Sequence, residues 1–191
     1  MTMQLPLFPL PAHILPGGRL ALRVFESRYL RMVKDACLSG SGFGICMLND
    51  KGDKDSNQHI YPIGTWVQIV DFNQLENGLL GLLVEGQSFF TVRDIVTDSD
   101  GLRIGECEIW SKSAQETQQN FDCQVLRERL KELFDLYPEF EALYEKPQFD
   151  DCRWVLYRWM EVLPVSPQQK QMFIEKRSLS AVYEYLQDLV R

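Results

Sequence analysis

The sequence predicts an α+β fold in which a strand-rich N-terminal part forms a closed or nearly closed barrel and the C-terminal part forms a helical bundle. Up to about residue 113, short apolar runs alternate with turn residues, which is typical of strands joined by tight turns. After that point, apolar residues recur at helical spacing. We therefore expect two parts, residues 1–113 and 114–191. The polar segment 111–120 has the composition of a linker between them.

The first elements are an extended segment, a turn and a strand. Residues 5–10 (LPLFPL) are apolar, and we expect them at a sheet edge because Pro6 and Pro9 cannot donate a ladder hydrogen bond. Residues 15–18 (LPGG) predict a turn, since proline fixes φ and glycine allows a positive φ. Residues 20–24 then indicate a short, half-buried strand.

A helix is predicted over residues 26–38, where apolar residues share one face. These residues are Phe25, Tyr29, Met32, Val33, Ala36 and Cys37. Residues 39–42 (SGSG) end the helix. Residues 43–48 are apolar throughout, which predicts a central strand, and residues 49–59 form a polar, charged loop.

Turn dipeptides predict two hairpins in the rest of the strand-rich part. Residues 65–72 and 79–84 flank an Asn-Gly pair, which is the strongest short hairpin signal. Residues 89–96 and 102–110 flank Asp100-Gly101 and form the second hairpin. Antiparallel strands this short and closely spaced favour a barrel, because closure removes exposed sheet edges.

The C-terminal part begins with a helix that ends at Pro138 and carries the stripe Leu126, Leu130, Leu133, Phe134 and Tyr137. Residues 166–169 (SPQQ) combine a serine cap, a proline at the first helical position and a capping-box glutamine. Ser178 is expected to cap a final helix. Residues 149–163 are apolar nearly all round, so we expect this helix in the core with its aromatic residues Trp154, Tyr157 and Trp159.

Charge and composition exclude several classes of protein. The 191 residues contain 20 basic and 27 acidic side chains, a net charge of −7, which disfavours a general binder of nucleic acids or anionic membranes. No apolar run approaches the ~20 residues that span a bilayer, and the N-terminus lacks the features of a signal peptide. Five cysteines are scattered without paired spacing. We therefore expect neither a disulfide framework nor a zinc knuckle, and a reducing cytoplasm as the compartment.

The titratable residues predict no catalytic, metal or cofactor site. A cysteine hydrolase needs a thiolate and a histidine base, and only His13 and His59 are present. Cys46 lies in an apolar strand, where burial raises the pKa of a thiol and makes it inert. The acidic residues near His59 match no calcium-loop spacing, so a solvated loop is the preferred interpretation of the set Asp50, Asp53 and Asp55.

Four segments form a series that is similar to a known family. They are residues 5–10, residues 15–18, residues 25–29 (FESRY), and Leu163-Pro164 followed by Lys170, Gln171 and Glu175. In this order they resemble the LON substrate-binding domain family, the N-terminal domain of Lon proteases, in its free-standing form. The motif residues, to which we assign structural roles, are Pro9, Pro16, Gly17, Phe25, Glu26, Arg28 and Tyr29.

The resemblance implies a PUA-like β-barrel-type subdomain followed by a helical bundle. It also implies a non-catalytic recognition module that binds exposed apolar protein segments or a protein partner. Lon proteases continue into an ATPase module and a Ser-Lys peptidase. The present sequence contains no Gly-x4-Gly-Lys-Ser/Thr loop, so we expect neither activity from this chain.

Other interpretations remain open at the level of sequence. Glu26 and Arg28 are either a ligand-binding charge pair or, as we prefer, a local pair beside a helix N-terminus. A small-ligand binding protein and an enzyme without a recognised motif are also possible. An RNA-binding PUA-like module would use the basic residues that residues 1–34 hold against Glu26 alone, namely Arg19, Arg23, Arg28, Arg31 and Lys34.

Overall fold

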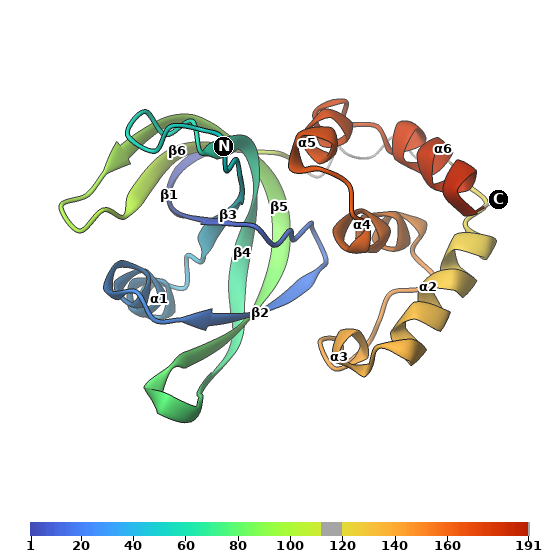
Figure 1. Cartoon of the computed structure of the whole chain (residues 1–191), viewed down its shortest axis with the longest axis horizontal. Helices are drawn as coiled ribbons and strands as arrows, with labels where there is room; N and C mark the ends of the chain where they lie inside the picture. The colour runs from blue at the N-terminus through green and yellow to red at the C-terminus, as the bar shows by residue number, and fades with distance from the viewer. Residues whose placement is uncertain (112–119, 191) are drawn as a thin grey trace. The chain divides into compact units, whose positions relative to one another are not determined.

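The structure, a computed structural model, describes residues 1–111 and 120–190 (Figure 1). The chain divides into two compact units, Met1–Ser111 and Lys112–Arg191. The first unit contains a sheet and one long helix, and the second is helical. The boundary expected between residues 113 and 114, and most of the expected linker 111–120, lie outside the described residues.

The first unit is organised by a sheet with the strand order β2-β5-β4-β3-β1-β6. β6 pairs with β5 as well as with β1, so five of the strands close a cycle of pairings around the core (Figure 1). The expected α+β fold class is confirmed. The strands are β1 (Thr2–Leu10), β2 (Arg19–Val24), β3 (Phe43–Leu48), β4 (Ile60–Gln74), β5 (Leu80–Thr97) and β6 (Arg103–Ile109).

β1 corrects one expectation, because this proline-containing strand is not at a sheet edge. It pairs in parallel with β3 and antiparallel with β6. The β6 pairing covers residues 2–7 and the β3 pairing covers residues 7–10. Pro6 therefore has a partner only on β6 and Pro9 only on β3. Each proline can direct its nitrogen to the unpaired side, so neither breaks a ladder.

β5 corrects a second expectation, since residues 79–84 and 89–96 belong to one strand. No turn separates them; instead, the register against β4 shifts between Trp66 and Val67, where the partners pass from Ser88 to Gly86. Such a bulge bends a strand without ending it. Both predicted hairpins are present: β4 pairs with β5, and β5 pairs with β6.

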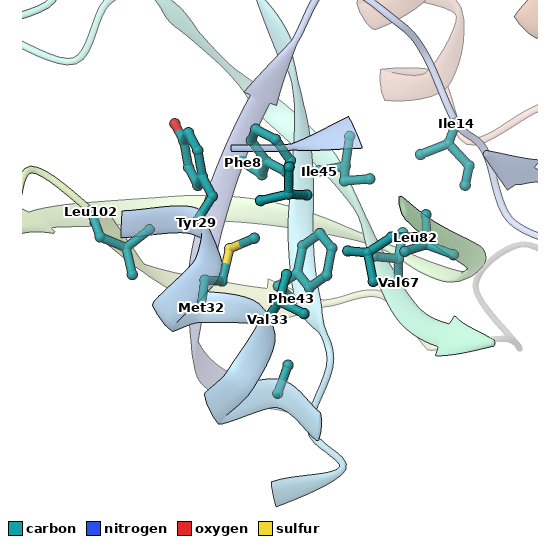
Figure 2. Packing of buried hydrophobic residues seen from close by; sticks show 13 residues of the cluster. Phe8, Ile14, Tyr29, Met32, Val33, Phe43, Ile45, Val67, Leu82 and Leu102 are labelled. Carbon is teal, nitrogen blue, oxygen red and sulfur yellow. The ribbon is translucent and has the colours of Figure 1, made fainter. Parts of the chain in front are cut away.

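The helix α1 (Ser27–Ser39) buries one face against the sheet. Figure 2 shows Tyr29 and Met32 projecting from this helix toward Phe8 and Phe43 of the strands. Gly40 ends the helix with a φ of 68°. The expected apolar stripe was too wide, because Cys37 is exposed, and so is Phe25, which lies before the first helical turn.

The second unit contains α2 (Gln124–Leu136), α3 (Pro138–Glu141), α4 (Cys152–Val162), α5 (Pro167–Glu175) and α6 (Leu179–Val190). Two serines have the capping roles predicted for them. The Ser166 hydroxyl accepts from the Gln169 amide, and the Ser178 hydroxyl from the Ser180 amide. α4 is buried on most sides, as expected. Within the described chain, no helix combines the length and the apolar character needed to cross a bilayer.

One disulfide, between Cys123 and Cys152, corrects the expectation drawn from cysteine spacing. Cys123 precedes α2 and Cys152 begins α4, and these two helices pack together. The 29-residue separation carries no local pattern, because tertiary packing alone brings the two sulfur atoms together. The cysteines therefore no longer argue for a reducing compartment.

Candidate functional site

A pocket of about 380 Å³ opens in the first unit, where several elements begin or end. β1, β2 and β3 reach it with their C-terminal ends, whereas α1 and β6 reach it with their first residues. Lys54 and His59 come from the loop between β3 and β4. The volume lies within the range of small-molecule and side-chain sites. We call this cavity the basic pocket, because four cations line it: Arg23, Arg28, Lys54 and Arg103.

The basic pocket gathers most of the motif residues singled out in the sequence. It is lined by Pro9, Phe25, Glu26, Arg28 and Tyr29. Pro16 and Gly17 are not among its lining residues and belong to the turn before β2.

The turn at Pro16 and Gly17 has a structural explanation. Gly17 has a φ of 77°, a conformation that side chains rarely adopt. Its amide donates to the Gly86 carbonyl at 2.9 Å, and the Gly86 amide donates to the Gly18 carbonyl at 2.8 Å. The turn is therefore attached to β5 at its bulge, which positions the start of β2.

Glu26 and Arg28 form an ion pair of 2.8 Å at the entrance to α1. Glu26 is the N-cap residue, but its side chain caps no helix amide and instead accepts from Arg28 Nε at 3.0 Å. The Arg28 guanidinium also lies 4.9 Å from the centre of the Tyr29 ring. Glu26 and Arg28 therefore pair with each other and also line the pocket. A local pair at the helix N-terminus and a ligand-binding charge pair do not exclude each other here.

Arg28 and Arg103 converge on one backbone oxygen. Arg28 Nη1 donates to the Gly101 carbonyl at 3.2 Å, and Arg103 Nη1 donates to the same oxygen at 3.4 Å. Arg103 also donates to Asn57 Oδ1 at 2.8 Å and to the Lys54 carbonyl at 3.2 Å. These neutral acceptors hold the guanidinium in place without cancelling its charge.

Three of the four pocket cations differ from most arginines outside the pocket in having no carboxylate partner in the described part of the chain. Arg23, Lys54 and Arg103 form no ion pair with a carboxylate within the described residues. Six arginines outside the pocket do so: Arg19, Arg31, Arg93, Arg127, Arg129 and Arg158. The basic pocket is thus a local positive region in a chain whose net charge is −7.

His59 lies in the wall of the pocket and is only 4% exposed, which contradicts the solvated loop expected for it. Burial lowers its pKa, and the charges of Arg103 and Lys54 lower it further. A hydrogen bond to the backbone of Asp53 acts in the opposite direction. Nδ1 is buried and has no hydrogen-bond partner among the described residues. The neutral ring of His59 therefore keeps one buried acceptor atom, Nδ1, next to the pocket cations.

Tyr29 supplies an aromatic wall beside these polar groups. Its ring stacks on Phe8 with the ring centres 4.1 Å apart, and burial raises the pKa of its hydroxyl. The hydroxyl is therefore protonated at neutral pH. Phe25 lines the same pocket but is 69% exposed. The site thus combines cations with aromatic surface that a ligand can contact.

A second cavity, of about 440 Å³, lies in the helical unit, and we call it the apolar groove. Arg129 and Glu132 at its margin form an ion pair of 3.0 Å. Trp159 contributes its ring, while its indole N–H donates to the Leu126 carbonyl at 2.9 Å. Trp159 thus lines the groove and is only partly buried, whereas Trp154 and Tyr157 are buried. The leucines of the groove are Leu133, Leu136, Leu163, Leu186 and Leu189.

The other groups considered in the sequence form no reactive site. Cys46 and Cys107 are buried, and burial raises the pKa of both thiols, that of Cys107 to about 12. Among residues 1–111 and 120–190, no three His, Cys, Asp or Glu side chains are grouped as metal ligands. Three of the five basic residues proposed for RNA binding pair with carboxylates, namely Arg19, Arg28 and Arg31. That pairing disfavours an RNA interface.

Comparison with known proteins gives one family match and several relatives. The family model of the ATP-dependent protease La (LON) substrate-binding domain matches residues 4–191. A curated relative, Lon protease 2 of Myxococcus xanthus, is 26% identical over 144 residues, which are 72% of this chain and 17% of the relative. The Lon protease of Anaeromyxobacter dehalogenans is 24% identical over 141 residues, again 72% of this chain and 17% of the relative. The chain thus spans about a sixth of the length of these relatives.

Two solved structures have the same fold. A Lon N-terminal domain protein from Xanthomonas campestris superposes with a TM-score of 0.73 at 29% identity, covering 97% of this chain and 98% of that one. The N-terminal domain of the Mycobacterium avium complex Lon protease gives a TM-score of 0.65 at 13% identity, with 98% of each chain covered. At that identity, the second likeness concerns the fold alone.

Proposed function

Because this chain belongs to the LON substrate-binding domain family, we propose that it is a recognition module which binds exposed apolar segments of polypeptides and catalyses no reaction itself. The apolar groove is the observation that supports this function most directly. It presents leucine side chains to solvent, with Leu136 74% exposed and Leu189 55% exposed. Exposed apolar surface of this kind is typical of protein interaction sites.

The groove has the composition that an apolar peptide segment requires. Its wall consists of leucines and the Trp159 ring, and its charged margin is already neutralised by the Arg129–Glu132 pair. An apolar segment that enters would lose contact with water without leaving a polar group of the groove unpaired. A leucine-lined groove between helices favours apolar side chains at helical or extended spacing.

Binding of an unfolded protein tests this function. A globular protein with reduced and alkylated cysteines is titrated with the full chain, and its native form serves as the comparison. We expect the unfolded form to bind and the native form not to bind. Leu136→Glu should weaken binding about tenfold, because the bound apolar segment would cover a charged side chain beside the leucines.

Met172→Glu is the matched control for this test, since Met172 is an exposed apolar residue of the helical unit outside the groove. It should bind as tightly as the unmodified chain. Equal binding of native and unfolded protein would contradict the proposal. Indifference to every polypeptide, together with tight capture of a small metabolite, would favour a small-ligand binding protein instead.

A further inference from the structure

We propose that the basic pocket binds a carboxylate that a polypeptide carries next to an apolar side chain. This inference rests on the proposed function, because it names a chemical group that the bound polypeptide would present. The carboxylate belongs either to the C-terminus of the polypeptide or to an acidic side chain. Both offer the same planar pair of acceptor oxygens.

The first argument is the charge of the pocket. Four cations meet there, and Glu26 is the only carboxylate among the lining residues, which all belong to the described part of the chain. Glu26 already pairs with Arg28. Like charges held close together repel one another, so an entering anion gains from all of them at once. A net-negative chain that leaves three neighbouring cations without a carboxylate has the electrostatics of an anion site.

The second argument is the geometry of the donors. Arg103 uses one N–H from each of its nitrogens for fixed backbone and side-chain acceptors, so two of its five N–H groups remain. Arg23 lies at the end of β2 and forms no ion pair within the described residues. A guanidinium binds a carboxylate through two parallel hydrogen bonds. The pocket thus holds Arg103 as a donor that is already oriented and Arg23 as a donor that can adapt to a ligand.

The third argument distinguishes a peptide from a simple anion. A simple anion offers charge alone, whereas the end of a polypeptide also carries a side chain. Phe25 lines the pocket beside the cations and is 69% exposed, so it provides surface for an adjacent apolar side chain. The cations and this aromatic surface together match the end of an apolar peptide.

An RNA strand fits these observations less well. An extended phosphate backbone needs a continuous basic track, whereas the cation nearest along α1, Arg31, is bound by Asp98 and Asp100 at 2.8 and 2.7 Å. Glu26 lies at the pocket itself. These carboxylates limit the positive region to a site that fits a single anionic group.

Binding of short labelled peptides to the full chain, followed by fluorescence anisotropy, tests the proposal. The first peptide ends in leucine and phenylalanine with a free carboxylate. The second is the same peptide amidated, and the third is amidated but carries an aspartate before the phenylalanine. We expect the amidated peptide to bind about tenfold more weakly than the first. The third peptide distinguishes the sources, since recovery of affinity identifies an acidic side chain as sufficient.

Variants of the pocket cations locate the effect. Arg23→Gln and Lys54→Gln should each remove most of the preference for the free carboxylate, and Arg103→Gln should do the same if circular dichroism shows it folded. Lys34→Gln removes the same charge from an exposed position of α1 outside the pocket and should retain the preference. Arg23 has a side chain exposed at a strand end, so its variant remains informative if Arg103→Gln does not fold.

The outcomes separate this inference from the proposed function. Equal affinity for the free and amidated peptides, with binding still lost in Leu136→Glu, would overturn the carboxylate site and leave apolar recognition intact. Displacement of the first peptide by a short single-stranded RNA at similar concentration would also overturn it. Absence of binding to any peptide would overturn both.

Discussion

Arg28 and Arg103 donate to the same carbonyl oxygen, that of Gly101, at 3.2 and 3.4 Å. The turn between β5 and β6 is thereby attached to the first turn of α1. Gly101 has a φ of 86°, and a Cβ atom added there would lie 3.2 Å from Arg28 Nη1. The backbone conformation favours glycine, and an added Cβ would also displace the Arg28 guanidinium from the Gly101 carbonyl.

Gly101→Ala should therefore lower the free energy of unfolding by about 2 kcal/mol. Urea denaturation measures the change. Gly78→Ala is the matched control, because Gly78 has a φ of 75° but no atom within 4 Å of an added Cβ. It should cost only the backbone strain, about 1 kcal/mol. Equal losses in both variants would show that the guanidinium contact contributes nothing.

His59 should make the first unit sensitive to acid. Its folded pKa is lowered from 6.5, first by burial and then by Arg103 and Lys54. The unfolded chain therefore binds a proton below pH 6.5 that the folded chain resists. The resulting stability is present above pH 6.5 and is lost as the pH falls through the folded pKa. As the pH falls below 6.5, the unmodified chain should lose more unfolding free energy than His59→Gln. Parallel losses in both proteins would contradict this.

The disulfide between Cys123 and Cys152 should stabilise the helical unit. Closing a loop with a sequence separation of 29 residues restricts the unfolded chain, which corresponds to about 3.6 kcal/mol in the loop-entropy description. Dithiothreitol should therefore lower the thermal midpoint of this unit. The double variant Cys123→Ser, Cys152→Ser should have a low midpoint that the reductant does not change. Alkylation of both thiols in protein purified without reductant would show that the bond is not formed.

Lys170 should make stability increase in alkaline solution. It is 2% exposed, and burial lowers its pKa to about 8, although Glu161 acts in the opposite direction. From pH 8 to about 10.5, the unfolded chain holds a proton that the folded chain has released, so stability rises with pH. Relative to Lys170→Met, the native chain should gain about 3 kcal/mol over this interval. Subtracting the unfolding free energy of Lys170→Met removes the opposing contribution of buried thiols and tyrosines, which both proteins share. A difference that does not change with pH would refute the prediction.

The sequence patterns identified the elements whose signals are local. The Asn-Gly and Asp-Gly hairpins, the apolar strand over residues 43–48 and the Ser166 cap all depend on neighbours in the chain. The edge assignment for β1 was wrong for the opposite reason. Proline restricts the side on which a strand pairs at one residue, but the chain changes partner between Pro6 and Pro9. No local pattern records such a staggered pairing.

The basic pocket shows the same division between local and distant signals. Its motif residues from β1 and the FESRY segment were identified because they are contiguous. Lys54, His59 and Arg103 were missed as a group, since each belongs to a different turn or strand end. The loop over residues 49–59 was recognised as polar, but polarity did not reveal that His59 is buried. Pairing of β1 with both β3 and β6 is what brings these segments to one place.

That arrangement of β1 also determines an order of events during synthesis. β1 is translated before both of its neighbours, β3 and β6, and its partner residues on β6 extend to Glu108. Until β6 has been translated, one side of β1 keeps backbone groups without a strand partner beside the apolar side chains of Leu5 and Leu7. Pairings between such distant segments form slowly, and open strand edges attract other chains. A nascent molecule therefore exposes the kind of surface that chaperones shield.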